Sequence, residues 1–221
     1  MPREADYPLL PEKPPDHLSC FAPGGGVVTA GFRAPARPDL ARDLVGRVEV
    51  AGATWRAAGR EREAAPQDVV QSAQHGIAAD AQALSRIVGR LGSWPGRTLV
   101  GADGCEAALA IALNADHDPA FQLALLRMLA DAVRLGEATT AQWAHLHDRC
   151  LVGSGRSQQF GTQYWLREGR LEMCPVADPQ GLGKRRADVG LPPREELIAR
   201  LERRHLPRHG AGDVTSERSV A

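Results

Sequence analysis

The sequence predicts a mainly α protein with one small β-hairpin, an α+β domain whose compact core consists of about five helices. Three observations lead to this prediction. Apolar residues recur at helical spacing through residues 66–149, proline and glycine separate the periodic segments, and alternation replaces the helical period at residues 159–176. A hydrophobic fraction of 43% and a charged fraction of 24% are ordinary for such a globular domain.

The two ends of the chain differ from its middle. Residues 1–37 contain seven prolines and three consecutive glycines, and residues 207–221 are polar without an apolar period. Proline removes backbone donors, and glycine costs entropy to order. We therefore expect a flexible arm at 1–37, a peripheral helix at 38–65, a single globular domain at 66–206 and a disordered tail at 207–221.

The first two helices are predicted over residues 38–63 and 66–91. In the first, an apolar stripe that includes Leu44 is weakened by three glycines, so we expect this helix at the edge of the core. In the second, Pro66 occupies the first helical position and apolar residues keep helical spacing until Gly92 stops the helix.

Residues 93–101 are predicted to connect the second helix to the third, because proline and glycine punctuate this stretch. A third helix at 103–114 is apolar on nearly all sides, which is typical of a central, buried helix.

The fourth and fifth helices have recognisable caps. Asp118 directly precedes Pro119 and can cap a helix that runs to Leu135. Thr139 or Thr140 can cap a further helix that ends near Arg149.

Beyond residue 158 the pattern predicts a β-hairpin, a loop and a last helix. Residues 159–167 alternate, Glu168-Gly169 suits a turn, and residues 171–176 form the returning strand. The loop contains Lys184-Arg185-Arg186, whose two arginines either bind an anion or belong to a solvated surface. The last helix covers residues 193–205.

The composition argues against several classes of protein. With 27 basic and 27 acidic residues the formal net charge is zero, so no global field favours DNA, RNA or an anionic membrane. No apolar run reaches the ~20 residues of a membrane span, and no signal peptide is recognisable. The four cysteines form no CxxC pair, which favours reduced, buried thiols over disulfides or zinc. We expect a cytoplasmic protein without a metal or another cofactor.

Three groups of polar residues are candidates for chemistry, and the first is Asp116-His117-Asp118. A histidine between two carboxylates is favoured in its cationic form and can act as an acid or a base. Asp116 and His117 are then the candidate catalytic residues. The alternative is a polar linker in which Asp118 caps the following helix.

The second group is His145-Leu146-His147-Asp148-Arg149. Two metal ligands on a helix share a face at i and i+4, whereas His145 and His147 are two apart and diverge by roughly 200°. This spacing does not favour a metal site. Asp148 and Arg149 belong either to a structural network or to a site at which Arg149 contacts a ligand.

The third and most unusual group is the segment from Gln158 to Trp165. On a strand, Gln159, Gly161 and Gln163 point to one side, and a glycine inside a strand indicates a bulge or a close approach. Such paired amides suit a peptide, a nucleobase or a sugar. They can equally satisfy buried backbone groups beside the helices.

Several short segments between about residues 78 and 204 follow a recognisable order. They are Gly92-Ser93-Trp94-Pro95, Leu99-Val100-Gly101, Ala115-Asp116-His117-Asp118-Pro119, Asp148-Arg149, Gly161-Thr162-Gln163, Arg185-Arg186 and Val189-Gly190-Leu191-Pro192. This order resembles a bacterial domain-of-unknown-function family, number sixty-six twenty-four, of which the GTQ segment is the most specific part. The family brings no biochemical function. The resemblance implies that one site contains Asp148, Arg149, Gln158, Thr162 and Gln163.

The chain departs from the family pattern at Leu113-Asn114, where the family usually has Gln-His. An amide does not titrate, so Asn114 cannot replace a histidine that acts as a base. This departure favours a non-catalytic binding or protein-interaction module for an unknown small molecule or protein. Its polar site then lies around Asp148-Arg149 and Gly161-Thr162-Gln163.

The alternative is a small hydrolase or transferase in which Asp116 or His117 is the acid or base. Polar residues gathered at helix ends, beside a strand that contains a glycine, motivate this interpretation. In that case Arg149, Gln159 and Gln163 hold the substrate.

Overall fold

The computed structural model of the protein describes residues 34–60, 67–167 and 170–205. These residues form seven helices and one antiparallel β-hairpin, which confirms the mainly α architecture. In chain order the elements are α1 (Pro38–Arg60), α2 (Gln67–Leu91), α3 (Arg97–Leu113), α4 (Pro119–Arg134), α5 (Thr140–Gly153), β1 (Tyr164–Arg167), β2 (Arg170–Met173), α6 (Leu182–Asp188) and α7 (Arg194–His205). The predicted tail at 207–221 and most of the predicted arm lie outside the described residues.

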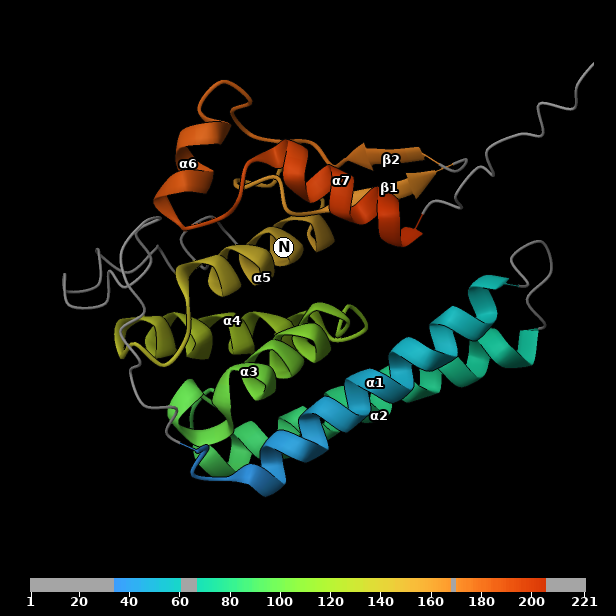
Figure 1. The fold of residues 1–221 in the computed structure, drawn as a ribbon, viewed down its shortest axis with the longest axis vertical. Coiled ribbons are helices and arrows are strands. Elements are labelled where there is room, and N and C mark those ends of the chain that lie inside the picture. Colours follow the sequence, from blue (N-terminus) through green and yellow to red (C-terminus); the bar gives the residue numbers. More distant parts are fainter. Residues whose placement is uncertain (1–33, 61–66, 168–169, 206–221) are drawn as a thin grey trace, which may run out of the picture.

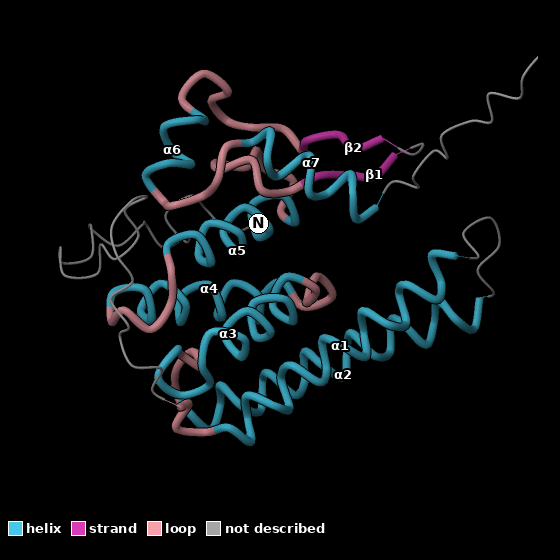
Figure 2. The backbone as a smooth tube through the Cα atoms, in the orientation of Figure 1, coloured by secondary structure: helices cyan, strands magenta, loops and turns pink. Residues whose placement is uncertain are grey.

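The elements stack in the order of the sequence (Figure 1). α1 and α2 lie side by side, α3 and α4 form the next layer, and α5 lies on α4. α6, α7 and the hairpin of β1 and β2 cover the other side of α5, where long stretches of loop separate the short elements (Figure 2). α5 therefore separates the regular helical layers from an irregular C-terminal layer.

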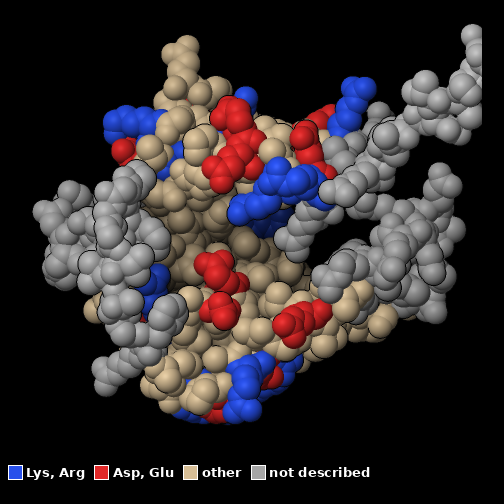
Figure 3. All heavy atoms as spheres, in the orientation of Figure 1, with Lys and Arg blue, Asp and Glu red and all other residues tan. Residues whose placement is uncertain are grey.

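The surface has no field of one sign on the face shown in Figure 3. Acidic and basic side chains are interspersed there, in keeping with the formal net charge of zero. Among the described helices, none combines the length and apolar character needed to cross a membrane.

α1 contributes directly to the core, although the sequence placed this helix at the edge. Leu44 is fully buried and belongs to the main apolar cluster, because α1 packs along α3. Residues 34–37, expected in the arm, have a defined course here: the amides of Ala36 and Arg37 donate to the carbonyls of Thr98 and Leu99 at 3.0 and 2.8 Å. These bonds fix the start of α1 against the start of α3.

A Leu44→Ala substitution tests this placement of α1. Loss of a fully buried leucine costs the transfer free energy of its methyl groups and leaves a cavity, so we expect unfolding in urea to be easier by about 2–5 kcal/mol. Val50 lies on the same helix with 68% of its surface exposed, and Val50→Ala should change stability by less than about 0.5 kcal/mol. Equal effects of the two substitutions would contradict a core position for Leu44.

α3 begins earlier than the sequence predicted, since residues 97–100 form a helical turn where a loop was expected. The Glu137 carboxylate accepts the backbone amide and the hydroxyl of Thr98, both at 2.7 Å, and so satisfies donors at this helix start. Gly101 then adopts φ 73° and ψ 179°, which kinks the helix before its buried main part. A positive φ suits glycine, which explains how one element contains both the predicted loop and the predicted helix.

The caps of α4 and α5 agree with the sequence. The Asp118 carboxylate accepts the amide of Phe121 at 3.0 Å, which confirms that Asp118 caps α4. Thr139 and Gln142 form a reciprocal capping box at the start of α5. The capping box fixes where α5 begins, and with it the direction of Asp148 and Arg149 about two and a half turns later.

Two predictions for the C-terminal layer were wrong. The strand expected at 159–167 begins only at Tyr164, because Gly161 has φ 62° and the preceding amides turn inward to a side chain instead of to another strand. The loop expected around Arg185 and Arg186 contains the seven-residue helix α6. Its brevity and two nearby glycines leave no apolar period for a sequence pattern to detect.

Candidate functional site

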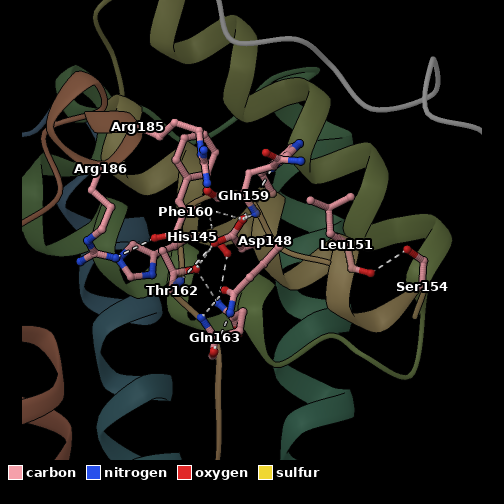
Figure 4. A network of polar contacts seen from close by, with 12 residues as sticks. His145, Asp148, Leu151, Ser154, Gln159, Phe160, Thr162, Gln163, Arg185 and Arg186 are labelled. Atoms are coloured by element: carbon pink, nitrogen blue, oxygen red, sulfur yellow. Dashed lines mark hydrogen bonds and ion pairs between the residues drawn. The ribbon is translucent and has the colours of Figure 1, made fainter. Parts of the chain in front are cut away.

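Asp148 organises the segment 158–163, called the GTQ loop below. Its carboxylate is fully buried and accepts the amides of Gln159 at 2.8 Å, Phe160 at 3.1 Å and Thr162 at 3.1 Å. The Thr162 hydroxyl donates to the same carboxylate at 3.0 Å (Figure 4). Four donors converge on one side chain, so Asp148 acts as a structural acceptor for the GTQ loop.

Two arginines of α6 donate to the backbone carbonyls of the GTQ loop, whose amides bind Asp148. The Arg186 guanidinium, buried to 2% exposure, donates to the carbonyls of Phe160 at 2.7 Å and Gly161 at 3.2 Å. It also donates twice to the carbonyl of Pro192, at 2.9 and 2.7 Å. Arg185 donates to the carbonyl of Gln159 at 2.8 Å. The sequence suggested that this pair binds an anion or lies on a solvated surface. Arg186 does neither, because it is buried and donates to backbone carbonyls.

Gln158 ties the GTQ loop to the chain that leaves β2. Its fully buried amide donates to the carbonyls of Gln163 at 3.0 Å and Cys174 at 2.8 Å, and its oxygen accepts the Gln163 amide at 2.9 Å. All these partners are backbone groups of the protein. Gln158 therefore satisfies buried backbone, which was the structural alternative for the glutamines.

Gln159 and Gln163 do not form the expected pair on one face of a strand. The segment is a loop, and the side chain of Gln163 turns toward α5, where it donates to the His145 carbonyl at 3.3 Å and the Thr162 hydroxyl at 3.0 Å. Gln159 is held through its backbone: its amide donates to Asp148 and its carbonyl accepts from Arg185.

The two histidines of α5 face different surroundings, as their spacing predicted. His147 stacks on Trp143 with ring centroids 4.5 Å apart and meets the edge of Phe160 at 5.9 Å. His145 lies beside Arg186 (Figure 4), and burial, with smaller contributions from Arg186 and Arg200, lowers its pKa. Among the described residues, no group of three or more His, Cys, Asp or Glu side chains is arranged to hold a metal ion.

Arg149 and Asp116 form the part of the polar cluster that reaches solvent. The guanidinium Nε donates to Asp116 Oδ1 at 2.8 Å and to the Leu113 carbonyl at 3.1 Å, and Nη2 donates to Asp116 Oδ2. Nη1 donates to Gln163 Oε1 at 3.4 Å. The two side chains remain 32% and 49% exposed. Arg149 is thus fixed in place and still accessible.

A groove of about 580 Å³ lies beside this ion pair, where α3 ends, α4 begins and α5 ends. Apolar and small residues form most of its walls. The lining residues are Asp116, Pro119, Gln122, Leu123, Arg149, Cys150, Val152, Gly153, Ser154 and Gly155. The sequence singled out only Asp116 and Arg149 among them, because residues from three helix ends meet here only after folding.

The Cys150 thiol in the groove wall is not an activated nucleophile. Burial raises the pKa of the Cys150 thiol to about 12, so the thiol stays protonated and unreactive near neutral pH. The Gln122 amide donates to the Ala112 carbonyl at 2.9 Å and to Asp116 at 3.4 Å. His117, a candidate acid or base, is exposed and does not line the groove.

A comparison with known protein families gives a result for most of the chain. Residues 38–206 match a family described as Family of unknown function (DUF6624). The chain belongs to this family. No curated protein and no solved structure matches the chain.

Membership of DUF6624 covers all the described helices and the complete site. The five residues that the resemblance grouped lie close together: Gln158, Thr162 and Gln163 belong to the GTQ loop, Asp148 of α5 accepts from this loop, and Arg149 contacts it through Gln163. Within this cluster, the side chain that both lines the groove and retains exposure is Arg149.

Proposed function

We propose that the protein is a non-catalytic binding module that holds a small molecule in the groove beside Arg149 and Asp116. The observation that carries this proposal is that the Arg149 side chain is both held in one orientation and partly exposed. Its guanidinium is oriented by Leu113, Asp116 and Gln163, yet it remains partly exposed at the wall of a groove of about 580 Å³. A preorganised cation at the edge of a mostly apolar groove is typical of a ligand site.

Asp148 supports the site indirectly, through the GTQ loop. The GTQ loop is held by Asp148 on one side and by Arg186 on the other, so the Gln163 side chain that meets Arg149 is carried by a rigid segment. A binding side chain whose neighbours are fixed loses little entropy when a ligand arrives.

The chemistry of the groove favours binding over turnover. The one thiol in the wall is protonated near neutral pH, and His117 lies outside the lining residues. Asp116 is engaged by Arg149 and Gln122. A hydrolase or transferase needs a poised acid, base or nucleophile within reach of the bound substrate.

A thermal-shift screen of the full chain against metals, nucleotides, sugars and amino-acid derivatives tests this proposal. A ligand at 100 times its Kd stabilises the native state by about 2.7 kcal/mol, which should raise the Tm by about 5 °C or more. The shift should vanish in Arg149→Ala and persist in Arg134→Ala, a matched control because Arg134 also pairs with an aspartate on an exposed helix surface.

Three outcomes would overturn the proposal. A ligand that stabilises wild type and Arg149→Ala equally binds elsewhere, and an absence of any stabilising ligand leaves the groove without a binding role. Chemical conversion of a bound ligand by wild type but not by Asp116→Asn would replace the binding module with an enzyme.

A further inference from the structure

The ion pair leaves part of Arg149 available to a ligand. A guanidinium carries five N–H donors. Nε is shared by Leu113 and Asp116, one donor of Nη2 goes to Asp116, and one donor of Nη1 goes to Gln163. Two donors therefore remain among the described contacts, one on each terminal nitrogen.

Asp116 likewise retains acceptor capacity. Its Oδ1 accepts from Arg149 Nε and from Gln122 Nε2, whereas Oδ2 has Arg149 Nη2 as its one partner among the described residues. A carboxylate oxygen can accept two hydrogen bonds, and this side chain is 49% exposed. Because Oδ2 and Nη2 are direct partners, an acceptor and a donor lie next to each other at the groove wall.

The charges of the groove cancel. Arg149 and Asp116 are the charged residues in its wall, and they neutralise each other. A ligand anion would gain contact with Arg149 but would meet the carboxylate beside it, and a ligand cation would meet the guanidinium. An ion would lose its hydration without a net attraction in return.

We propose that the groove takes a neutral ligand that ends in a primary carboxamide. This inference rests on the proposed function and names the ligand class of the same site. The carboxamide oxygen accepts from an unused Arg149 donor, and its NH₂ group donates to Asp116 Oδ2. The apolar body of the ligand lies against Pro119, Leu123 and Val152, which line the same groove.

An NMR titration of the full ¹⁵N-labelled chain with benzamide and benzoate tests the ligand class. The two probes have the same ring and differ in the group that meets the ion pair. We expect benzamide to shift the Arg149 Nε–H signal and the Gly153 and Gly155 amides saturably, with a Kd at least tenfold lower than that of benzoate. Benzoate binding at the groove as tightly as benzamide, or more tightly, overturns the inference.

An Asp116→Asn variant provides a sharper test of the charge argument. The substitution removes the compensating charge, so Arg149 gives the groove a net positive charge and benzoate should become the preferred probe. The ratio of the two Kd values should change by at least tenfold relative to wild type. Asp131→Asn, which removes the partner of Arg134 on the exposed surface of α4, should leave the ratio unchanged. A preference for benzamide that persists in Asp116→Asn contradicts the inference.

The titrations separate a failure of this inference from a failure of the proposed function. If benzoate alone shifts the groove signals in an Arg149-dependent way, the carboxamide class is wrong and the binding site stands. If neither probe shifts these signals, the carboxamide class is also wrong, and the ligand screen decides the function independently.

Discussion

Asp148→Ala should destabilise the protein by about 4 kcal/mol. The change leaves three backbone amides and the Thr162 hydroxyl without their acceptor in a fully buried position. Each unsatisfied buried donor costs about 1–3 kcal/mol, partly recovered if water enters. Total stabilities are about 5–15 kcal/mol, so the variant should be marginal at 37 °C. Urea unfolding followed by circular dichroism measures the loss.

Two comparison variants make this expectation specific. Asp131→Ala removes an aspartate that is 68% exposed and should change stability by less than about 0.5 kcal/mol. Asp148→Asn keeps one oxygen acceptor but places an NH₂ group among donors, so its stability should lie between those of wild type and Asp148→Ala. If Asp148→Ala unfolds within 1 kcal/mol of wild type, the GTQ loop does not depend on this carboxylate.

Arg186→Ala should destabilise the protein by about 3 kcal/mol. The guanidinium satisfies the carbonyls of Phe160, Gly161 and Pro192 while almost fully buried, and hydrogen bonds from a charged group contribute about 1.5–3 kcal/mol each. Part of this sum is offset, because the alanine variant no longer has to desolvate a buried charge. The same loss should appear as faster hydrogen exchange of the Phe160 and Thr162 amides, because the loop loses its support on the α6 side.

Arg186→Lys distinguishes the shape of the guanidinium from its charge. A single ammonium cannot span carbonyls on both sides as the planar fork does, so the lysine variant should recover less than half of the loss. Lys184→Ala on the same helix is the matched control, because this side chain is 81% exposed and pairs only with Asp188 among the described residues. Full recovery by lysine would show that charge alone supports the loop.

The helices were predictable because their signals are local. Pro66 preceding α2, Asp118 at α4 and Thr139 at α5 are capping signals read within a single turn, and the apolar spacing between them follows directly from helical geometry. The side chain of a cap bonds to a backbone group two or three residues away, so the residues next to the helix start are enough to predict it.

The site could be predicted only in part because its partners are distant in sequence. The unusual composition of residues 158–165 marked the correct segment, but alternation suggested a strand. The amides of Gln159 and Phe160 instead bind Asp148, and their carbonyls bind arginines 26 residues further along the chain. Alternation along the segment cannot show that the Asp148 carboxylate, and not a neighbouring strand, accepts from these amides.

The groove escaped prediction for a related reason. Arg149 and Asp116 were recognised separately, one as a helix residue and one as a linker residue, and their pairing spans 33 positions. Gln122 and Ser154 have no unusual sequence context at all. Only the meeting of three helix ends makes their surfaces face one another.

The backbone of the GTQ loop lies between two buried charged side chains. Asp148 and Arg186 carry opposite charges in the interior, yet backbone groups of the GTQ loop lie between them, with N–H groups toward the carboxylate and C=O groups toward the guanidinium. The Gly161–Thr162 peptide binds both side chains. The dipoles of these backbone N–H and C=O groups therefore replace the hydrogen bonds that water molecules would make to each ion. Among the described contacts, the two buried ions are accommodated by backbone groups that solvate them and not by a direct ion pair.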